Sequence, residues 1–365
     1  MSDHAPHVAV VPQTPGTVTL HPLHGIPEVA VGDDLGSLLR AALERAGLAL
    51  ADGDVLAVSS KVISKAQGLR EDGEGRADAV LRHATRVVAE RRTATGTTRI
   101  VEAVAGPVMA GAGIDGSNTG ADTRLLLLPP DPDLAARELY AALLTAYAPQ
   151  PLPRVGIVVT DTAGRPWRAG QTDFALGACS VEVLDDLRGQ TDADGRPLAV
   201  TSRAIADEIA AAADLVKGKS SGVPAVLVRG LPAGTVSSPG AAGARTLVRT
   251  GLGDWFALGS AEAVRAALGA PPGTAAAEDV GVPSAAPEEY AERLGRAVRL
   301  ALHGETAARV SESPRDVTEL VVRADDPYAT GRIVARLEIA LAGEGLTGLT
   351  VTGSSGPGLP AGKGC

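Results

Sequence analysis

The sequence predicts a mixed α/β (α+β) protein with a small α/β appendage at its C-terminal end. Short apolar runs rich in β-branched residues indicate buried strands and alternate with stretches of helical periodicity; the runs are Val55–Val58, Val155–Thr160 and Ala225–Val228. Aromatic residues make up 2% of the chain and hydrophobic residues 45%, so valine, leucine, isoleucine and alanine must build the core. At 365 residues the chain is long enough for two or three domains.

Charge and cysteine content argue against several classes of protein. A net charge of −9 at pH 7 disfavours binding to nucleic acid, and the scarcity of aromatic residues disfavours stacking on bases. Two cysteines, Cys179 and Cys365, are too few for a disulfide scaffold or a thiolate metal cage, which is typical of a reducing cytoplasm. The beginning of the chain lacks a signal-peptide pattern, and no apolar run reaches about eighteen residues. We therefore expect a cytoplasmic protein with no membrane partner.

Turn and cap residues divide the first part of the chain into elements. We expect residues 1–15 to form a loose arm, because they are polar and contain proline. Asp34 is expected to cap a helix over Leu35–Ala46. The charged stretch Glu71–Arg92 predicts a helix, and Arg99–Ala103 predicts a strand.

Two lysines follow the predicted strand Val55–Val58. In the stretch SSKVISKAQG, Lys61 and Lys65 are four residues apart, and Ser60 offers a hydroxyl donor. A local pair of cations in an acidic chain indicates an anionic ligand. The alternative is a lysine face that contacts only solvent.

A glycine-rich stretch, AGAGIDGSNTGADT at Ala110–Thr123, cannot form the interior of a helix. Its glycines allow backbone amides to approach a ligand closely, and Asp115 and Asn118 would point into the same space. A buried strand is predicted directly after it at Leu125–Leu128, and a loop held between core elements often carries function. The alternative is a flexible turn that only joins those elements.

The stretch VGIVVTDTAGRPWRAGQTD, residues 155–173, holds the densest set of candidate ligands. Its apolar run stops at Asp161 and Thr162, so a carboxylate and a hydroxyl are expected at the end of a strand. Arg165 and Arg168 follow around a turn, and the stretch ends with Gln171 and Asp173. Oxygen ligands beside cations are typical of a metal–phosphate site. The alternative is a strand cap followed by a surface loop of ion pairs.

A lysine- and glycine-containing loop, KGKSSG at Lys217–Gly222, follows a predicted helix over Thr201–Leu215. Its GKSS sequence is similar to part of a P-loop, but the upstream glycine at the required spacing is missing. The loop also follows a helix and precedes a strand, which is the reverse of the P-loop order. We therefore exclude a Walker site and keep the loop as a candidate nucleotide contact.

The last hundred residues differ in character. Residues 261–287, rich in proline, glycine and alanine, predict a linker. Residues 288–352 predict a small appendage with a helix over 288–303 and then a strand, a helix and a strand, at Glu319–Ala324, Ile333–Ala342 and Leu346–Thr352. The glycine- and proline-rich tail 353–365 is expected to be disordered.

Several segments, in this order, resemble the coenzyme F420-0:γ-glutamyl ligase family: HGIPEVAVGDDL, DGDVLAVSSKVISKAQG, GAGIDGSN, LLPPDPDLAAR, VVTDTAGRPWRAGQTDFALG, TSRAIADEIAAAADLVKGK and PAVLVRG. They span about residues 16–260. The resemblance implies a two-lobed α/β ligase that dimerises with itself, uses GTP, and adds L-glutamate to coenzyme F420-0 or its dehydro form. It also implies a divalent cation, Mg²⁺ or Mn²⁺, with K⁺ as a further candidate. Actinobacterial members often carry a reductase domain after the ligase; the extension here is too short for one.

The resemblance also implies the site residues. It places Asp115, Asp161 and Thr162 at the metal ions. It places twelve residues around the nucleotide: Ile26, Pro27, Glu28, Val29, Ser60, Lys65, Asn118, Lys217, Gly218, Lys219, Ser220 and Gly222. Archaeal-type members carry an acidic metal-binding residue where this chain has Lys219, so the number and geometry of the metals are open.

The chemistry of the residues agrees with an amide-forming ligase. Transfer of a phosphoryl group to a carboxylate would give an acyl phosphate, which an amine then attacks. We expect Arg165 and Arg168 to be the catalytic cations that offset the charge of the acidic substrates. Two alternatives remain: a module that binds nucleotide or deazaflavin without turnover, and a GTP-dependent amide ligase for another phosphorylated acid.

Overall fold

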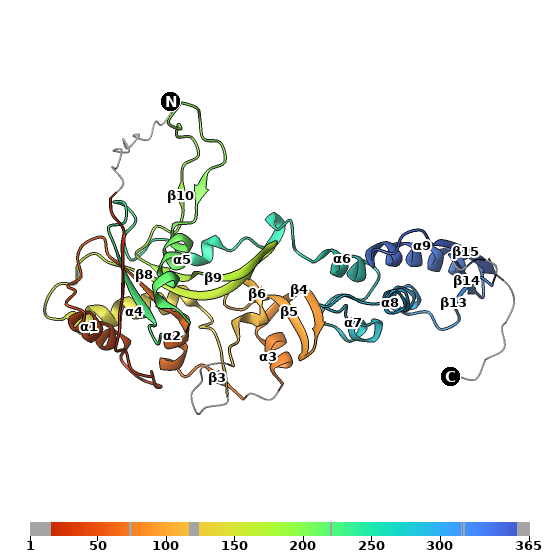
Figure 1. Ribbon diagram of the computed structural model, residues 1–365, viewed down its shortest axis with the longest axis horizontal. Helices are drawn as coiled ribbons and strands as arrows, with labels where there is room; N and C mark the ends of the chain where they lie inside the picture. Colours follow the sequence, from red (N-terminus) through yellow and green to blue (C-terminus); the bar gives the residue numbers. More distant parts are fainter. Residues whose placement is uncertain are drawn as a thin grey trace, which may run out of the picture. The chain divides into compact units, whose positions relative to one another are not determined.

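The computed structural model describes residues 16–355 except 73–74, 117–123, 220, 315 and 317. Within this part of the chain it contains nine α-helices and fifteen strands, which confirms the predicted mixed α/β class (Figure 1). The chain divides into two compact units. Unit 1 comprises the described residues of Met1–Glu74, Val104–Pro107 and Gly113–Arg249, and unit 2 comprises those of Gly75–Ala103, Val108–Ala112 and Thr250–Cys365. The arm predicted for residues 1–15 lies outside the described residues.

Unit 1 contains both strands and helices, and strands also follow one another directly along the chain. Its elements are β1 (Thr19–Pro22), α1 (Leu35–Arg45), β2 (Val55–Ser59), α2 (Ser60–Ala66), β3 (Arg70–Glu71), β7 (Leu125–Leu126), α4 (Pro132–Tyr147), β8 (Gly156–Arg165), β9 (Arg168–Cys179), β10 (Asp185–Asp186), β11 (Ser202–Arg203), α5 (Ile205–Lys217), β12 (Ala225–Arg229) and a short 3-10 helix, Ala244–Leu247. As expected, Asp34 caps α1: its carboxylate accepts a hydrogen bond from the Ser37 backbone amide.

A five-stranded sheet in the order β1-β12-β2-β8-β9 forms the centre of unit 1. β2 and β8 run parallel, and the other neighbouring strands run antiparallel. Alternate residues of these strands face α5, which lies against β8 and β9 (Figure 1). That face buries Val55, Ala57, Val158, Val226 and Val228 against Ala206, Ile209, Ala210 and Ala213. Helix α4, packed on α1, contacts β8 and β9.

β8 and β9 form a long antiparallel hairpin, which corrects the loop expected after Thr160. The pairing runs from Ile157 opposite Cys179 to Arg165 opposite Arg168. Pro166 and Trp167 form the turn, and Trp167 has a positive φ of 59°. The change from apolar to polar residues marks where the hairpin becomes more exposed. The strand itself continues there, because pairing satisfies the backbone whether or not the side chains are apolar. Asp161 and Thr162 therefore lie within a strand.

Gly177 in β9 allows the sheet to approach α4 closely. A Cβ atom at this position would lie 2.2 Å from the carbonyl oxygen of Pro132. We expect Gly177→Ala to lower the free energy of unfolding by about 1–3 kcal/mol, because overpacking forces the backbone to shift. Denaturant unfolding measures this loss. Gly164→Ala is the control, since a Cβ there would meet no atom within 4 Å. Equal losses in the two variants would contradict the steric argument.

Unit 2 contains two small sheets and several helices. Its elements are α3 (Arg76–Arg82), β4 (Ala84–Thr93), β5 (Gly96–Ala103), β6 (Val108–Ala110), α6 (Ser260–Ala267), α7 (Ala275–Val280), α8 (Tyr290–Leu302), β13 (Arg309–Glu312), β14 (Glu319–Ala324), α9 (Pro327–Gly343) and β15 (Thr350–Ser355), with a short 3-10 helix at Gly251–Gly253. Another, Gly111–Gly113, spans the boundary between the units. The sheet orders are β4-β5-β6 and β13-β14-β15.

Two expectations for unit 2 are wrong. The predicted helix Glu71–Arg92 is instead the end of β3, the helix α3 and most of β4, because the helix ends at Arg82 and β-branched residues follow. Residues 261–287, expected as a linker, contain most of α6 and all of α7. Leu268, Ala270 and Val280 of that segment are buried in one core with α8, α9 and β14. Its prolines and glycines form the turns between short helices.

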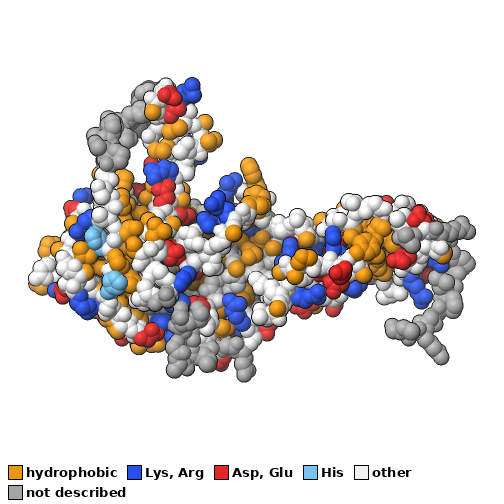
Figure 2. Space-filling view, viewed as in Figure 1, with side chains coloured by type: hydrophobic (Ala, Val, Ile, Leu, Met, Phe, Trp, Pro, Cys, Tyr) orange, Lys and Arg blue, Asp and Glu red, His pale blue; other side chains and the backbone are white. Residues whose placement is uncertain are grey.

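The strand, helix and strand expected near the C-terminal end are confirmed as β14, α9 and β15, with β14 and β15 parallel. β15 begins at Thr350, later than predicted, and includes 353–355 of the expected tail, while 356–365 lie outside the described residues. On the face shown in Figure 2, basic and acidic side chains are interspersed. No helix in the described part of the chain is both long and apolar enough to span a membrane.

Candidate functional site

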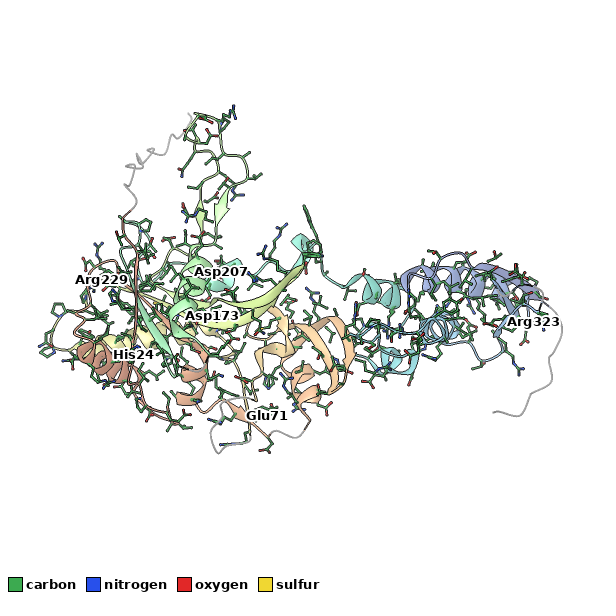
Figure 3. All side chains as sticks on the ribbon, viewed as in Figure 1. His24, Glu71, Asp173, Asp207, Arg229 and Arg323 are labelled. Carbon is green, nitrogen blue, oxygen red and sulfur yellow. The ribbon has the colours of Figure 1, made fainter. Side chains whose placement is uncertain are left out.

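A group of hydroxyl, carboxylate and ammonium side chains lies where the end of α5 meets β8 and β9; Figure 3 labels its central residue, Asp173. The Asp173 carboxylate accepts hydrogen bonds from Thr160 Oγ1 at 2.9 Å and Thr162 Oγ1 at 2.6 Å. Lys217 Nζ donates to the same carboxylate and, at 2.6 Å, to Thr160 Oγ1. Lys219 Nζ donates to Thr162 Oγ1 at 2.6 Å. We call these five residues the α5-side group.

Strand alternation produces this arrangement. Thr160 and Thr162 follow Val158 at a period of two, so all three side chains face α5. Burial would raise the pKa of Asp173, but the charge of Lys217 and the hydrogen bonds hold that pKa below its usual value. Lys217 and Asp173 are both buried, so this ion pair fastens the end of α5 to the hairpin.

A second group lies on the opposite side of the sheet. Asp161 falls between Thr160 and Thr162, so its side chain faces away from α5. Lys61 in α2 forms an ion pair with Asp115 at 2.5 Å, and both side chains are about one-third exposed. Asp115 is held by two backbone hydrogen bonds to Leu126, of 3.0 and 2.8 Å. We call Lys61, Asp115 and Asp161 the α2-side group.

The Asp161 carboxyl is perturbed by its surroundings. Burial raises its pKa to about 6, with the negative charges of Asp173 and Asp115 adding to the effect. A hydrogen bond from the Thr162 backbone amide and the charge of Lys219 act in the opposite direction. Asp161 and Asp115 are therefore close enough for each charge to act on the other, which favours a cation between them.

We expect the stability of the protein to depend on pH through Asp161. Its pKa is 3.8 ordinarily and about 6 here, so between these values the folded protein holds a proton that the unfolded chain has lost. The stability contributed by this group is therefore lost as pH rises from about 4 through about 6. Asp161→Asn should melt at a higher temperature than the wild type at neutral pH in EDTA. The difference should shrink towards pH 4, and a difference independent of pH would contradict the assignment.

Lys65 lies next to the segment that the family resemblance assigned to the nucleotide. Its side chain is 6% exposed, and its Nζ is 2.5 Å from the Glu28 carboxylate, which is 71% exposed. Lys61 and Lys65 are four residues apart on α2, so they share one face of that helix, about 6 Å apart. Helix α2 thus brings the segment Ile26–Val29 within one helical turn of the α2-side group.

The structure brings together some of the expected site residues and separates others. Asp161 and Thr162 point to opposite sides of the sheet, so their side chains belong to different groups. Arg165 and Arg168 are exposed at the end of the hairpin, and Arg165 is three residues beyond Thr162, about 10 Å along the strand. Ser60 is buried at the start of α2. Gly218 and Gly222 have positive φ values of 62° and 66°. Asn118 and Ser220 lie outside the described residues.

The donor atoms of the α2-side group suit a hard divalent cation. Carboxylate oxygens such as those of Asp115 and Asp161 are the ligands that Mg²⁺ and Mn²⁺ prefer. The Thr162 hydroxyl differs, because it already bonds to Asp173 and Lys219. Within the described ranges, no cluster of three or more acidic, histidine or cysteine side chains has the geometry of a metal site. Asp115 and Asp161 therefore fit a metal that takes its remaining ligands from substrate or water.

Known proteins are similar to this chain over the part that contains both groups. A family model described as F420-0:Gamma-glutamyl ligase matches residues 25–230, which include both groups. A protein of Natronomonas pharaonis is 39% identical over 227 residues, covering 56% of this chain and 83% of the relative. A Halobacterium salinarum protein is 40% identical over 226 residues, covering 56% and 84%. A Methanothermobacter thermautotrophicus protein is 34% identical over 253 residues, covering 64% and 96%. Each relative is named coenzyme F420:L-glutamate ligase. The chain belongs to the F420-0:gamma-glutamyl ligase family.

Proposed function

We propose that this protein is a GTP- and divalent-metal-dependent ligase that adds L-glutamate to coenzyme F420-0, or to its dehydro form, in F420 biosynthesis. Family membership supports the reaction class. The observation that carries the proposal is the arrangement along α2. One of its lysines pairs with the metal-type carboxylate Asp115, and the other, one turn away, pairs with Glu28 in the proposed nucleotide segment.

The proposed reaction proceeds in two steps. A carboxylate oxygen of F420-0 bonds to the γ-phosphorus of GTP while the bond from that phosphorus to the bridging oxygen breaks, which gives an acyl phosphate and GDP. The glutamate amine then bonds to the acyl carbon, phosphate leaves with the bonding electron pair, and the amine proton passes to solvent. This activation is needed because a free carboxylate does not react with an amine at neutral pH.

The residues have separate roles in this proposal. Asp115 and Asp161 hold the divalent cation, which neutralises and aligns the phosphates when bound. Lys65 contributes an ammonium group beside Ile26–Val29, where it offsets phosphate charge. Arg165 and Arg168, which are exposed at the end of the hairpin, are the cations that offset the charge of the acidic substrates. Mg²⁺ or Mn²⁺ as the metal, K⁺ as a further cation and the homodimer stay predictions.

The proposal is tested by incubating the protein with GTP, Mn²⁺, L-glutamate and F420-0. We expect the mass of F420-0 to increase by one glutamyl unit, with one GDP released for each unit added. ATP in place of GTP is the control for nucleotide choice. Tight binding of GTP or F420-0 without product would support the binding-module alternative. GDP release with another phosphorylated acid, but not with F420-0, would support a ligase of different specificity.

Lys65→Met should raise the KM for GTP by about tenfold and leave the melting temperature nearly unchanged. The methionine keeps the buried stem and removes only the charge, and loss of one ion pair to an exposed partner costs little stability. A tenfold change corresponds to about 1.4 kcal/mol, which is typical of a charge-assisted hydrogen bond. Lys65→Arg, which keeps a cation, should recover part of the loss. An unaltered GTP titration would assign Lys65 to the solvated lysine face.

A further inference from the structure

The Thr162 hydroxyl has two protein partners, one of them a cation. It donates its single proton to Asp173 at 2.6 Å and accepts a hydrogen bond from Lys219 Nζ at 2.6 Å. A serine or threonine hydroxyl has one proton to donate and lone pairs to accept. A metal ion at this oxygen would lie beside the Lys219 ammonium, whose positive charge repels it, and no negative charge on the hydroxyl would offset that repulsion.

The charges on the two sides of the sheet differ in sign. Among the residues that the structure describes, the α5-side group has two ammonium groups, Lys217 and Lys219, and one carboxylate, Asp173. The α2-side group has one ammonium, Lys61, and two carboxylates, Asp115 and Asp161. A cation is therefore attracted to the α2 side and repelled from the α5 side.

We propose that the Lys219 ammonium is a built-in cation of this site, so that the protein takes one divalent cation, at Asp115 and Asp161, and no second one at Thr162 and Asp173. This inference rests on the proposed function, because it concerns the metal of that reaction. Lys219 is a positioning residue in this proposal: its ammonium lies against Thr162 and supplies a positive charge on the α5 side.

The position of Lys219 in the chain suits this role. Helix α5 ends at Lys217, and Gly218 leaves the helix with a positive φ of 62°, which a glycine adopts without strain. The glycine turns the chain so that Lys219, which is itself exposed, returns to the hairpin. Lys217, in contrast, is buried and pairs with Asp173. This ion pair fixes the end of α5 to the hairpin, so a substitution of Lys217 would lower the stability of the protein.

Titration of the full-length protein with Mn²⁺ alone, without nucleotide, tests the inference. Calorimetry should give one Mn²⁺ per chain for the wild type and for Lys219→Arg, which keeps the cation. Lys219→Glu should give two, because the α5 side then has two carboxylates to one ammonium. Arg323→Glu is the matched control: it makes the same change in net charge at an exposed residue of β14 and should leave one site (Figure 3).

Melting curves of each variant establish that it is folded before titration. Two Mn²⁺ bound by the wild type, or one bound by Lys219→Glu, would overturn the inference while leaving the metal dependence of the proposed function intact. If the wild type binds no Mn²⁺ and no Lys219 variant binds any, the metal dependence itself fails together with this inference.

Discussion

Asp161→Asn is expected to lower turnover by about three orders of magnitude and to leave the fold intact. Asparagine has nearly the same shape as aspartate, so the pairing of β8 with β9 should persist. It lacks the negative charge that holds the cation, and a metal ion contributes several kcal/mol to stabilising the transition state, with each 1.36 kcal/mol equal to a factor of ten in rate. Steady-state turnover at saturating GTP and limiting Mn²⁺ measures the loss.

The same variant should be more stable than the wild type at neutral pH, because it removes a carboxylate that burial and its neighbours disfavour. Loss of activity with a gain in stability separates a functional residue from a structural one. Asp207→Asn is the control. That carboxylate in α5 also has a raised pKa, but it accepts a hydrogen bond from the Ala175 backbone amide, which an asparagine can keep (Figure 3). Normal turnover of Asp161→Asn at limiting Mn²⁺ would contradict the metal assignment.

Truncation of the chain at Pro271 is expected to unfold unit 2. The sequence predicts a linker and a separate small appendage here, but in the structure the residues after Pro271 supply most of the apolar core that includes Leu268 and Ala270, and they hydrogen-bond to β4. Backbone hydrogen bonds join Arg92 of β4 to Pro283 at 2.7 Å and to Ala285 at 2.8 Å. The Gly273 backbone amide donates a hydrogen bond to the buried Glu90 carboxylate. Removal of this amide would leave the buried carboxylate with one hydrogen bond fewer.

A second buried ion group would also be lost with the truncated residues. Arg296 is 3% exposed and pairs through both ends of its guanidinium with Glu288 and Glu344, at 2.6 to 2.8 Å. Truncation removes all three members of this group together with α8 and α9, which carry much of the apolar core around them. We expect the truncated protein to be insoluble or to lose one unfolding transition in calorimetry.

Deletion of residues 356–365, which lie outside the described part of the chain, is the matched control and should leave the unfolding of unit 2 unchanged. Arg296→Met tests the same core without shortening the chain, and it should lower the free energy of unfolding by about 3–5 kcal/mol. A Pro271 truncation that is soluble, unfolds cooperatively and retains ligase activity would contradict the present description of unit 2.

Strands were predicted correctly from the sequence where burial determines the pattern of apolar residues. The apolar runs that became β2, β8 and β12 lie in the central sheet, so every position is covered and only hydrophobic residues suit them. Prediction from the sequence was wrong where the pairing of one strand with another determines the structure. The residues from Asp161 to Arg165 are too polar to indicate a buried strand. They nevertheless belong to β8, because β9 pairs with them and satisfies their backbone hydrogen bonds.

The candidate site shows the same division. Sequence spacing and family resemblance indicated Asp115, Asp161 and Thr162 as candidates, but not that the last two face opposite sides of the sheet; that follows from β8 continuing through them. Lys217 was expected at the nucleotide and is a buried partner of Asp173, a contact between elements that no local pattern encodes. The period-two spacing of Thr160 and Thr162 was the available signal, and it becomes useful once the strand is known to continue.

The most direct test of the account labels the reacting carboxylate. F420-0 carrying ¹⁸O in that carboxylate is incubated with the protein, GTP, Mn²⁺ and L-glutamate, and the released phosphate is examined by mass spectrometry. We expect one ¹⁸O atom in each phosphate released with a glutamylated product, because the carboxylate oxygen bonds to the γ-phosphorus and leaves with it. Glutamylated product with unlabelled phosphate, or phosphate release without any product, would contradict it.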